Sequence, residues 1–255
     1  MKKSTFTNLV ALALLLAATI WLNWKQGARD EIPSGSADAN YILAVSWQPA
    51  FCEQRPNVPE CRSQRKTRFD ASNFALHGLW PQMHDGIYCD VPNALVSADK
   101  FGRWNKLPKL DLSEPIRREL AIKMPGFRSY LHRHEWFKHG TCMPGFTHES
   151  YYRTALDLLD ELNGSAFKSF FVTHTGNKIP FAKLETEFVR SFGKAARNRM
   201  VVDCYRDQGR RIIQELKLSI AGDLNAGPGL AEFLANGEKV GRSCPSGIID
   251  PVGQQ

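Results

Sequence analysis

The sequence predicts a single α+β domain in which a central, mostly antiparallel sheet is flanked by helices and stapled by disulfides. Short apolar or alternating runs typical of strands occur beside longer amphipathic runs typical of helices. Six cysteines follow an N-terminal segment that looks like an export signal, which favours disulfides over free thiols. Neither an internal repeat nor a second linker divides the rest of the chain, so we expect one domain over residues 40–255.

Residues 1–39 are expected to be a signal peptide or an N-terminal membrane anchor, followed by a linker. Lys2 and Lys3 precede an apolar run at 9–22, as in a secretory signal. No small-x-small cleavage site follows closely, so membrane anchoring through residues 6–24 stays open, although the run is short for a span of about 20 residues. Both alternatives predict an exported protein, periplasmic or secreted, with a membrane-anchored form as the variant.

The composition is that of a globular protein with a basic folded domain. With 43% hydrophobic residues in 255, the chain can bury a substantial core, which excludes a disordered or fibrous protein. The formal net charge is +7, and removing 1–39 with its four basic and three acidic residues leaves +6. A basic domain favours a polyanionic partner such as nucleic acid, although charge alone does not choose the partner.

Four runs have the pattern of strands. The first, at 41–47, is apolar, nearly continuous and ended by Pro49, as a buried strand would be. The second, at 74–81, alternates apolar residues with others before a glycine and a proline stop it. The last two lie at 201–204 and 212–220.

Four helices and three loop segments complete the prediction. Ser113 is a suitable N-cap with Pro115 in the first turn, and that helix would stop before Pro125. The other helices are expected at 127–139, 149–162 and 180–192. Loop, or mostly loop, is expected at 52–68, 83–93 and 222–255. The basic residues of the first loop are equally compatible with a solvated surface and with phosphate contacts.

The stretch His-Glu-Trp-Phe-Lys-His-Gly-Thr-Cys at 134–142 concentrates titratable groups. On a helix that turns about 100° per residue, four polar side chains share an arc of roughly 140° while Trp136 and Phe137 point the other way. The four are His134, Glu135, Lys138 and His139. Gly140 is a suitable C′ residue for the helix. Because clustered titratable groups repel or must be desolvated, the cluster indicates chemistry.

His77 is the candidate partner for this cluster. It lies at a predicted strand end, on the face opposite Phe74 and Leu76. A lone histidine there is more often a satisfied core residue, but acid–base chemistry needs two titrating partners, and the segment 134–142 offers the second. The histidines His84, His132, His148 and His174 are expected to be surface or structural residues.

Metalloprotease and serine hydrolase chemistry are disfavoured. Lys138 stands where the zinc motif His-Glu-x-x-His needs its second ligand, and His139 is one place too far along the helix. The chain has neither a Gly-x-Ser-x-Gly elbow nor a Cys-x-x-Cys pair. Cleavage of RNA by its own 2′-hydroxyl, in contrast, needs only a base, an acid and positive charge on the phosphoryl oxygens.

Two segments resemble the active-site segments of the ribonuclease T2 family, namely Phe-Ala-Leu-His-Gly-Leu-Trp-Pro at 74–81 and the stretch at 134–142. Ser-Trp-Gln-Pro at 46–49, with Cys52, is similar to the first strand and cysteine of that family, and Asp-Gly-x-Tyr-Cys at 85–89 to its substrate loop. The resemblance spans most of the predicted domain and is nearest to bacterial members of the ribonuclease I type, which are exported to the periplasm.

The resemblance implies an endoribonuclease that cuts single-stranded RNA with low base specificity. The 2′-hydroxyl would displace the 5′-oxygen to give 2′,3′-cyclic phosphate ends, which can then be hydrolysed to 3′-phosphates. His139 would be the general base and His77 the general acid. His134 would hold the phosphate, while Glu135 and Lys138 would polarise it and stabilise the pentacovalent state.

The resemblance also implies substrate contacts and disulfides. Trp80 and Tyr88 fall where family members stack the base 5′ of the cut, and Gln82 stands where some members have an acidic base-reading residue. Spacing alone does not choose a cysteine pairing, but the family pattern implies Cys52 with Cys61, Cys89 with Cys142, and Cys204 with Cys244. The middle pair would hold the two active-site segments together.

The expected partner is therefore RNA and not DNA, with no cofactor or metal, and the expected state is a monomer. A competing hypothesis is an exported polyanion-binding protein that lacks catalysis.

Overall fold

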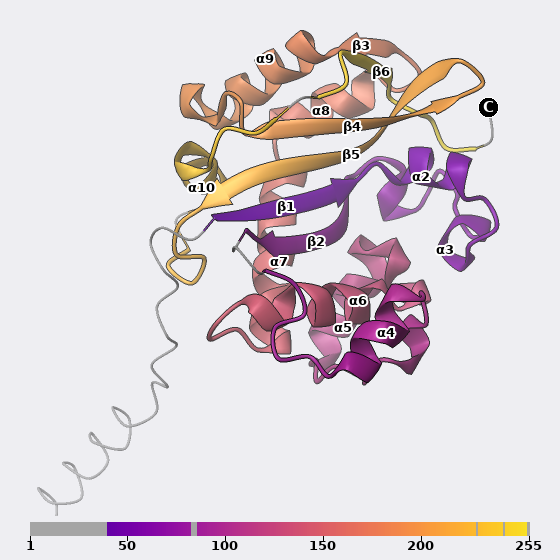
Figure 1. The fold of residues 1–255 in the computed structure, drawn as a ribbon. Coiled ribbons are helices and arrows are strands. Elements are labelled where there is room, and N and C mark those ends of the chain that lie inside the picture. The colour runs from indigo at the N-terminus through magenta and orange to yellow at the C-terminus, as the bar shows by residue number, and fades with distance from the viewer. Residues whose placement is uncertain (1–39, 83–85, 228, 242, 254–255) are drawn as a thin grey trace, which may run out of the picture. The chain divides into compact units, whose positions relative to one another are not determined.

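A six-stranded sheet is the frame of the fold in residues 40–82, 86–227, 229–241 and 243–253, which the computed structural model describes (Figure 1). The strands are β1 (Asn40–Ser46), β2 (Ala75–Pro81), β3 (Lys178–Pro180), β4 (Met200–Asp207), β5 (Arg210–Ala221) and β6 (Ser246–Ile248). The helices are α2 (Gln48–Gln54), α3 (Pro59–Arg62), α4 (Asn93–Lys100), α5 (Glu114–Lys123), α6 (Leu131–Lys138), α7 (His148–Asn163), α8 (Ala166–Thr173), α9 (Phe181–Phe192) and α10 (Leu230–Asn236).

The sheet is mostly antiparallel, as predicted. Its strand order is β2-β1-β5-β6-β3, and β4 also pairs with β5. Among the strands of the described ranges, the pairs β1–β2, β1–β5, β4–β5 and β3–β6 are antiparallel and β5–β6 is parallel. Since helices cover this sheet and all the described elements belong to one compact unit, the α+β single-domain prediction is confirmed.

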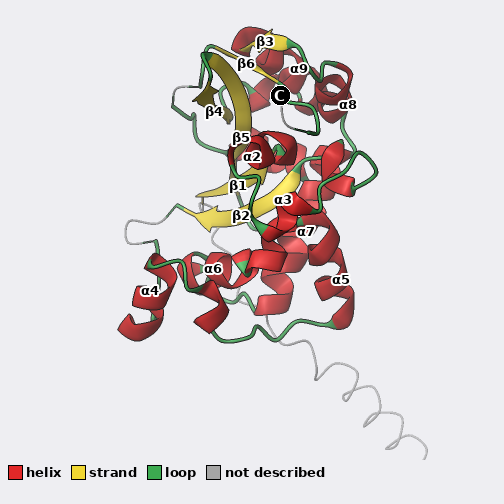
Figure 2. Cartoon of the chain, turned by 90° about the vertical axis from the view of Figure 1, so that its right-hand side faces the viewer, coloured by secondary structure: helices red, strands yellow, loops and turns green. Residues whose placement is uncertain are grey.

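Helices α7 and α8 lie behind the sheet, whereas α4, α5 and α6 gather below its β2 edge (Figures 1 and 2). An aromatic cluster joins the sheet to α8, with the ring centroids of Trp47 and Phe74 5.0 and 4.9 Å from that of Phe171. All three side chains are fully buried, and burial of such rings contributes about 1.5 to 3 kcal/mol each.

Helix α7 holds β2 at both ends. The Asn163 side chain accepts from the Phe74 N–H (2.9 Å) and donates to the Phe74 carbonyl (3.0 Å). The Tyr151 hydroxyl donates to the Leu79 carbonyl (2.9 Å) and accepts from its N–H (3.2 Å). These side chains satisfy backbone groups that the sheet edge leaves unpaired, so they fix the stretch of β2 that contains His77.

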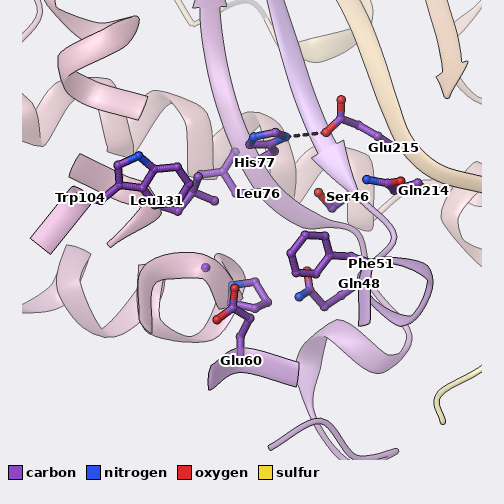
Figure 3. A pocket seen from close by; sticks show the side chains of 12 residues that line it. Ser46, Gln48, Phe51, Glu60, Leu76, His77, Trp104, Leu131, Gln214 and Glu215 are labelled. Carbon is purple, nitrogen blue, oxygen red and sulfur yellow. Dashed lines mark hydrogen bonds and ion pairs between the residues drawn. The ribbon is translucent and has the colours of Figure 1, made fainter. Parts of the chain in front are cut away.

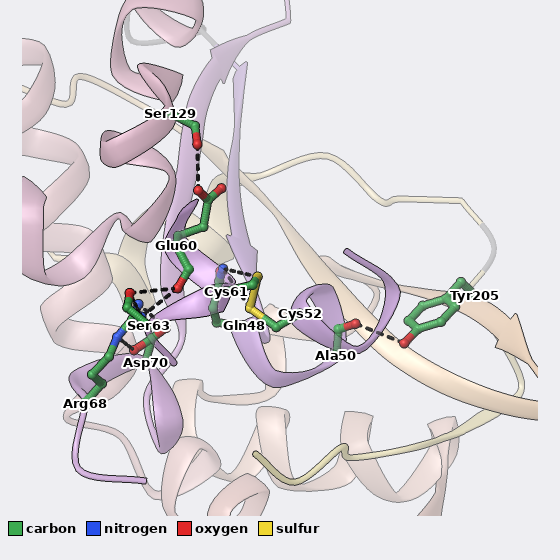
Figure 4. Close-up of a disulfide and its surroundings, with 10 residues drawn as sticks. All are labelled: Gln48, Ala50, Cys52, Glu60, Cys61, Ser63, Arg68, Asp70, Ser129 and Tyr205. Carbon is green, nitrogen blue, oxygen red and sulfur yellow. Dashed lines mark hydrogen bonds and ion pairs between the residues drawn. A yellow bond between two sulfur atoms is a disulfide. The ribbon is translucent and has the colours of Figure 1, made fainter. Parts of the chain in front are cut away.

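The loop predicted at 52–68 is interrupted by helix. The end of α2 and the single turn of α3 lie in it, and each helix has a proline in its first turn, Pro49 and Pro59. A proline ends a strand but also suits the first turn of a helix, where its missing N–H costs nothing. Of the basic side chains there, Arg68 is structural, because its guanidinium bonds both carboxylate oxygens of Asp70 at 2.9 and 2.8 Å (Figure 4).

The helix predicted at 127–139 begins later. Residues Pro125–Ser129 form a 3-10 turn, Tyr130 adopts a left-handed φ of 64°, and α6 starts at Leu131. Gly140 does follow the C-cap residue His139, at the C′ position predicted for it, but it opens a 3-10 turn and does not adopt a left-handed φ. A Cβ at this position would lie 2.3 Å from the Trp136 ring, and this close approach is the physical need for glycine.

The helix start at Ser113 is confirmed, since its side chain accepts from the Ile116 N–H, and the helices near 149–162 and 180–192 are α7 and α9. The two later strands extend beyond their predicted limits, as β4 and β5. The segment 222–255 is less loop-like than predicted, because α10 and β6 lie in it, and the sequence patterns also missed α4 and α8.

The structure pairs Cys52 with Cys61, Cys89 with Cys142, and Cys204 with Cys244, the three pairs that the resemblance implied. The predicted signal or anchor with its linker, 1–39, and the start of the predicted substrate loop, 83–85, lie outside the described residues. Within the described ranges, no helix combines the length and apolarity needed to cross a membrane.

Candidate active site

His77 is placed by an irregularity in the sheet. Along the β1–β2 pair, Ala44 lies opposite Gly78 and the next residue, Val45, opposite Leu76, so His77 is the extra residue of a β-bulge. Bulges of this kind re-aim a side chain and are common beside active sites.

Two carboxylates flank the His77 imidazole. Its Nδ1 lies 2.5 Å from Glu215 Oε2 on β5, and its Nε2 lies 3.4 Å from Glu135 Oε1 on α6. Burial lowers the pKa of His77, but the Glu135 charge and the hydrogen bond and charge of Glu215 outweigh it, so the pKa lies above the ordinary value. The imidazolium of His77 is therefore more stable relative to the neutral ring than in an unperturbed histidine.

Glu135 is the buried hub of the site. Its Oε2 accepts from Trp80 Nε1 at 2.7 Å, and its Oε1 lies 3.7 Å from His134 Nε2. Burial raises the Glu135 pKa above its ordinary value despite the nearby His77 and His134. The close approach of the Glu135 side chain to strand β2 requires glycine at position 78, because a Cβ there would lie 1.9 Å from Glu135 Oε2. This explains why glycine follows the histidine on β2.

His139 lies just past the end of α6, and its surroundings differ from those of His77. Its side chain is buried, it stacks on Trp80 with ring centroids 5.3 Å apart, and its Nδ1 has no hydrogen-bond partner among the described residues. Burial, helped by the positive charges of Lys138, His134 and His77, lowers its pKa to about 3. Neutral imidazole is therefore the favoured form of His139.

His134 is oriented by a carboxylate that sequence reasoning missed. Its Nδ1 lies 2.9 and 2.8 Å from the two oxygens of buried Asp99 at the end of α4. Asp99 Oδ2 also accepts from the Tyr88 hydroxyl at 2.7 Å, and Trp104 stacks on the His134 ring at 4.6 Å. The imidazole is thus held in one orientation by a charged partner and a ring.

The segment around Tyr88 is tied to α6. The Tyr88 N–H donates to the Lys138 carbonyl at 2.8 Å, and the Cys89–Cys142 disulfide follows directly. Tyr88 is half-buried, with Lys100 Nζ 5.8 Å from its ring centroid. Gln82 is exposed, and its amide donates to the Trp80 carbonyl at 3.1 Å. Gln82 is therefore outside the cluster that the other predicted residues form.

A cavity of about 160 Å³ opens beside His77 (Figure 3). Five of its lining side chains are apolar or aromatic, namely Phe51, Leu76, Trp104, Pro125 and Leu131. Polar groups come from Ser46, Gln48, Glu60, His77, Gln214 and Glu215. Flat, mainly apolar walls with a few fixed polar groups suit an aromatic ligand such as a nucleobase.

The structure thus brings His77, Trp80, His134, Glu135 and His139 together around one centre. The Lys138 charge is close enough to oppose the rise of the His77 pKa and to help lower that of His139. Sequence reasoning missed Glu215 and Asp99. The only signal for Glu215 was its place on an alternating strand, and nothing near Asp99 distinguished it from a surface residue. Within the described part of the chain, no group of three His, Cys, Asp or Glu side chains is arranged to hold a metal ion.

Comparisons with known proteins agree on one family. A model of the ribonuclease T2 family matches residues 39–227. Ribonuclease I of Escherichia coli (strain K12) is 27% identical over 236 residues, which cover 84% of this chain and 86% of that protein. A ribonuclease of Aeromonas hydrophila is 31% identical over 150 residues, 58% of this chain and 55% of that protein.

Two solved structures share the fold. The self-incompatibility associated SF11-RNase of Nicotiana alata has 15% identity and a TM-score of 0.56, covering 84% of this chain and 99% of that chain. A mutant of RNase MC1 in complex with 5′-UMP has 18% identity and a TM-score of 0.53, covering 73% of this chain and 90% of that chain.

Proposed function

The chain belongs to the ribonuclease T2 family and is an endoribonuclease, and we propose that it cuts single-stranded RNA by attack of the 2′-hydroxyl on the adjacent phosphate. The first products are a 2′,3′-cyclic phosphate and a free 5′-hydroxyl, and slower hydrolysis gives 3′-phosphates. Base specificity is low, and neither metal nor cofactor takes part.

The observation that carries this proposal is that the pKa values of two histidines, both in contact with Trp80, are shifted in opposite directions. His139, with its lowered pKa, is neutral and takes the proton of the 2′-hydroxyl as its oxygen bonds to phosphorus. His77, with its raised pKa, gives its proton to the 5′-oxygen as the P–O5′ bond breaks. Each proton transfer is worth roughly 10² to 10⁴ in rate.

The remaining polar groups handle the phosphate. His134, fixed by Asp99, holds a phosphoryl oxygen, and Lys138 supplies positive charge for the pentacovalent state. Glu135, whose raised pKa favours a shared proton, polarises the phosphoryl group from between His77 and His134. The second stage runs in reverse, with His77 taking a proton from water and His139 returning one to the 2′-oxygen.

Bases bind on both sides of the cut. Trp80 and Tyr88 stack the base 5′ of the cut, with Gln82 at the rim, and a stacked base contributes roughly 1 to 3 kcal/mol. The leaving nucleotide lies on the side of its acid, His77, so the cavity beside His77 receives the base 3′ of the cut.

Digestion of a defined oligoribonucleotide in EDTA tests the proposal. We expect cleavage to continue, with cyclic phosphate ends appearing before 3′-phosphates, and the matching oligodeoxyribonucleotide to stay intact because it lacks the 2′-hydroxyl. Loss of all cleavage in EDTA, or equal cutting of DNA, would refute the mechanism. Binding without any cleavage would favour a polyanion-binding protein instead.

We further propose that residues 1–39 export the protein as a signal or anchor, and that the ribonuclease domain, 40–255, acts as a monomer. The three disulfides support an oxidising compartment. Cell fractionation with N-terminal sequencing tests this. A mature N-terminus near residue 40 supports a cleaved signal, whereas recovery of the full chain from the membrane fraction supports the anchor.

A further inference from the structure

The cavity beside His77 contains a buried acidic side chain that the proposed chemistry does not use. Glu60, on α3, is only 4% exposed, yet it lines the same cavity as His77 and Trp104 (Figure 3). Its one side-chain hydrogen bond among the described residues is at Oε2, which accepts from the Ser129 hydroxyl at 2.6 Å. A buried carboxylate without a cation is costly unless further donors reach it.

Glu60 is held rigidly where it is (Figure 4). The adjacent Cys61 is bonded to Cys52 of α2, and Arg68 donates to the Glu60 carbonyl at 2.6 Å. Because its backbone is fixed on both sides, the carboxylate is preorganised rather than free to turn to solvent. A fixed buried acceptor on a cavity wall is a feature of a binding site.

Apart from His77, which the proposed chemistry uses as the acid, the described lining of the cavity adds no cationic side chain. The Gln48 amide nitrogen lies 3.6 Å from Cys52 Sγ and 4.0 Å from Cys61 Sγ, so that its donor faces the disulfide and its carbonyl oxygen is left as the acceptor. Neither lysine nor arginine is among the lining residues. The buried Glu60 carboxylate on this wall therefore suits a neutral ring that presents N–H donors, and it would repel a second phosphate.

The four bases differ in the hydrogen-bond donors that they can present to the Glu60 carboxylate. Guanine presents N1–H and N2–H₂ side by side, adenine and cytosine each present one amino group, and uracil presents one N3–H between two carbonyl oxygens that a carboxylate repels. Acceptance from exocyclic amino groups is the usual way in which Glu reads a base.

Building on the proposed function, we propose that Glu60 biases the otherwise low base specificity at the nucleotide 3′ of the cut, favouring bases with donor edges, guanine first and uracil last. Glu60 is a base-reading residue and takes no part in the bond-breaking steps.

The test uses the full domain and the four substrates ApG, ApA, ApC and ApU. The wild type should show a kcat/KM for ApG roughly tenfold or more above that for ApU. Glu60→Gln keeps the shape and an acceptor for Ser129 but loses the charge, and should bring the four values within about threefold. Glu114→Gln, a matched change at a side chain that is 66% exposed, should leave the wild-type order intact.

Hydrolysis of 2′,3′-cyclic AMP is the check on folding, because this substrate has no 3′ base. The inference fails if Glu60→Gln keeps the wild-type preference, if the wild type prefers ApU, or if the variant loses cyclic AMP hydrolysis in the same proportion. Inhibition of the wild type by 5′-GMP and 5′-UMP needs no variant, and 5′-UMP binding as tightly as 5′-GMP would also overturn it. Failure of the wild type to cut any of the four would instead refute the proposed function.

Discussion

His77 and His139 both contact the ring of Trp80, at centroid distances of 5.2 and 5.3 Å, but the protein surrounds them in opposite ways. His77 lies between the carboxylates of Glu215 and Glu135, whereas buried Nδ1 of His139 has no partner among the described residues. The first arrangement favours the imidazolium and the second the neutral ring. Thus one site can hold an acid and a base of the same residue type, because the neighbours and not the side chains set the protonation.

Removing either histidine should have the largest effect. His77→Ala and His139→Ala should each lower kcat by at least about 10² to 10⁴, while RNA binding persists, because each loses one proton transfer. Steady-state kinetics on a short oligonucleotide measure this, with fluorescence anisotropy for binding. His174→Ala, at the end of α8, is the control and should retain full activity. Near-normal turnover by either active-site variant would remove that histidine from the mechanism.

Glu215→Gln tests what makes His77 an acid. The amide keeps an acceptor for Nδ1 but loses the charge, so the pKa of His77 should fall. Because the acid form is then lost at lower pH, the alkaline limb of kcat/KM should move to lower pH, with roughly a tenfold loss at neutral pH. A pH–rate profile beside that of Glu114→Gln measures the shift. An unchanged alkaline limb would show that Glu215 only positions β5.

Asp99→Asn should act on binding more than on chemistry. The variant keeps a partner for Tyr88 but weakens the bond to His134, which we assign to the phosphate. We expect KM to rise about tenfold with a smaller change in kcat, since charge-assisted hydrogen bonds are roughly twice as strong as neutral ones. A drop confined to kcat would place His134 among the proton-transfer groups instead.

Asp250 is a buried carboxylate that, unlike Glu215 and Glu135, has no histidine beside it among the described residues. Asp250 is fully buried with neither oxygen hydrogen-bonded among the described residues, and burial together with nearby Glu53 raises its pKa to about 6. The folded protein keeps this proton where the unfolded chain releases it, so stability falls as pH rises through 6. Asp250→Asn should be more stable by up to about 3 kcal/mol above pH 6, with little difference below pH 4 and unchanged activity. Urea unfolding at several pH values checks this, and a pH-independent difference would contradict it.

The residues proposed to react could be predicted from the sequence, but most of the residues that surround them could not. The cluster at 134–142 was predictable because its titratable residues are close together in the sequence, whereas His77, a lone histidine, was predicted from that complementary cluster and from the resemblance to the ribonuclease T2 family. Glu215 lies 138 positions from His77 and Asp99 35 from His134, and both contacts exist only through the sheet register and the packing of α4. Glu60 lies in a segment predicted to be a loop, because proline, which opens α3 at Pro59, is common in loops as well as in the first turn of a helix.

The fold shows the same division. Strands with clear alternation and helices with capping residues were predictable, since the signal is local, as at Ser113. Short elements such as α3 and β6 depend on the contacts around them. The bulge at His77 depends on the register between β1 and β2, which neither strand determines alone. The reason for Gly78 likewise appears only once Glu135 is packed against it.

The most direct test of the account is titration of the individual imidazoles by NMR in the free protein, with His77 and His139 assigned through the corresponding single variants. We expect the His77 signal to titrate above the ordinary value of about 6.5 and His139 to stay neutral well below it. A His139 that titrates above His77 would reverse the assignment of acid and base and contradict the central claim.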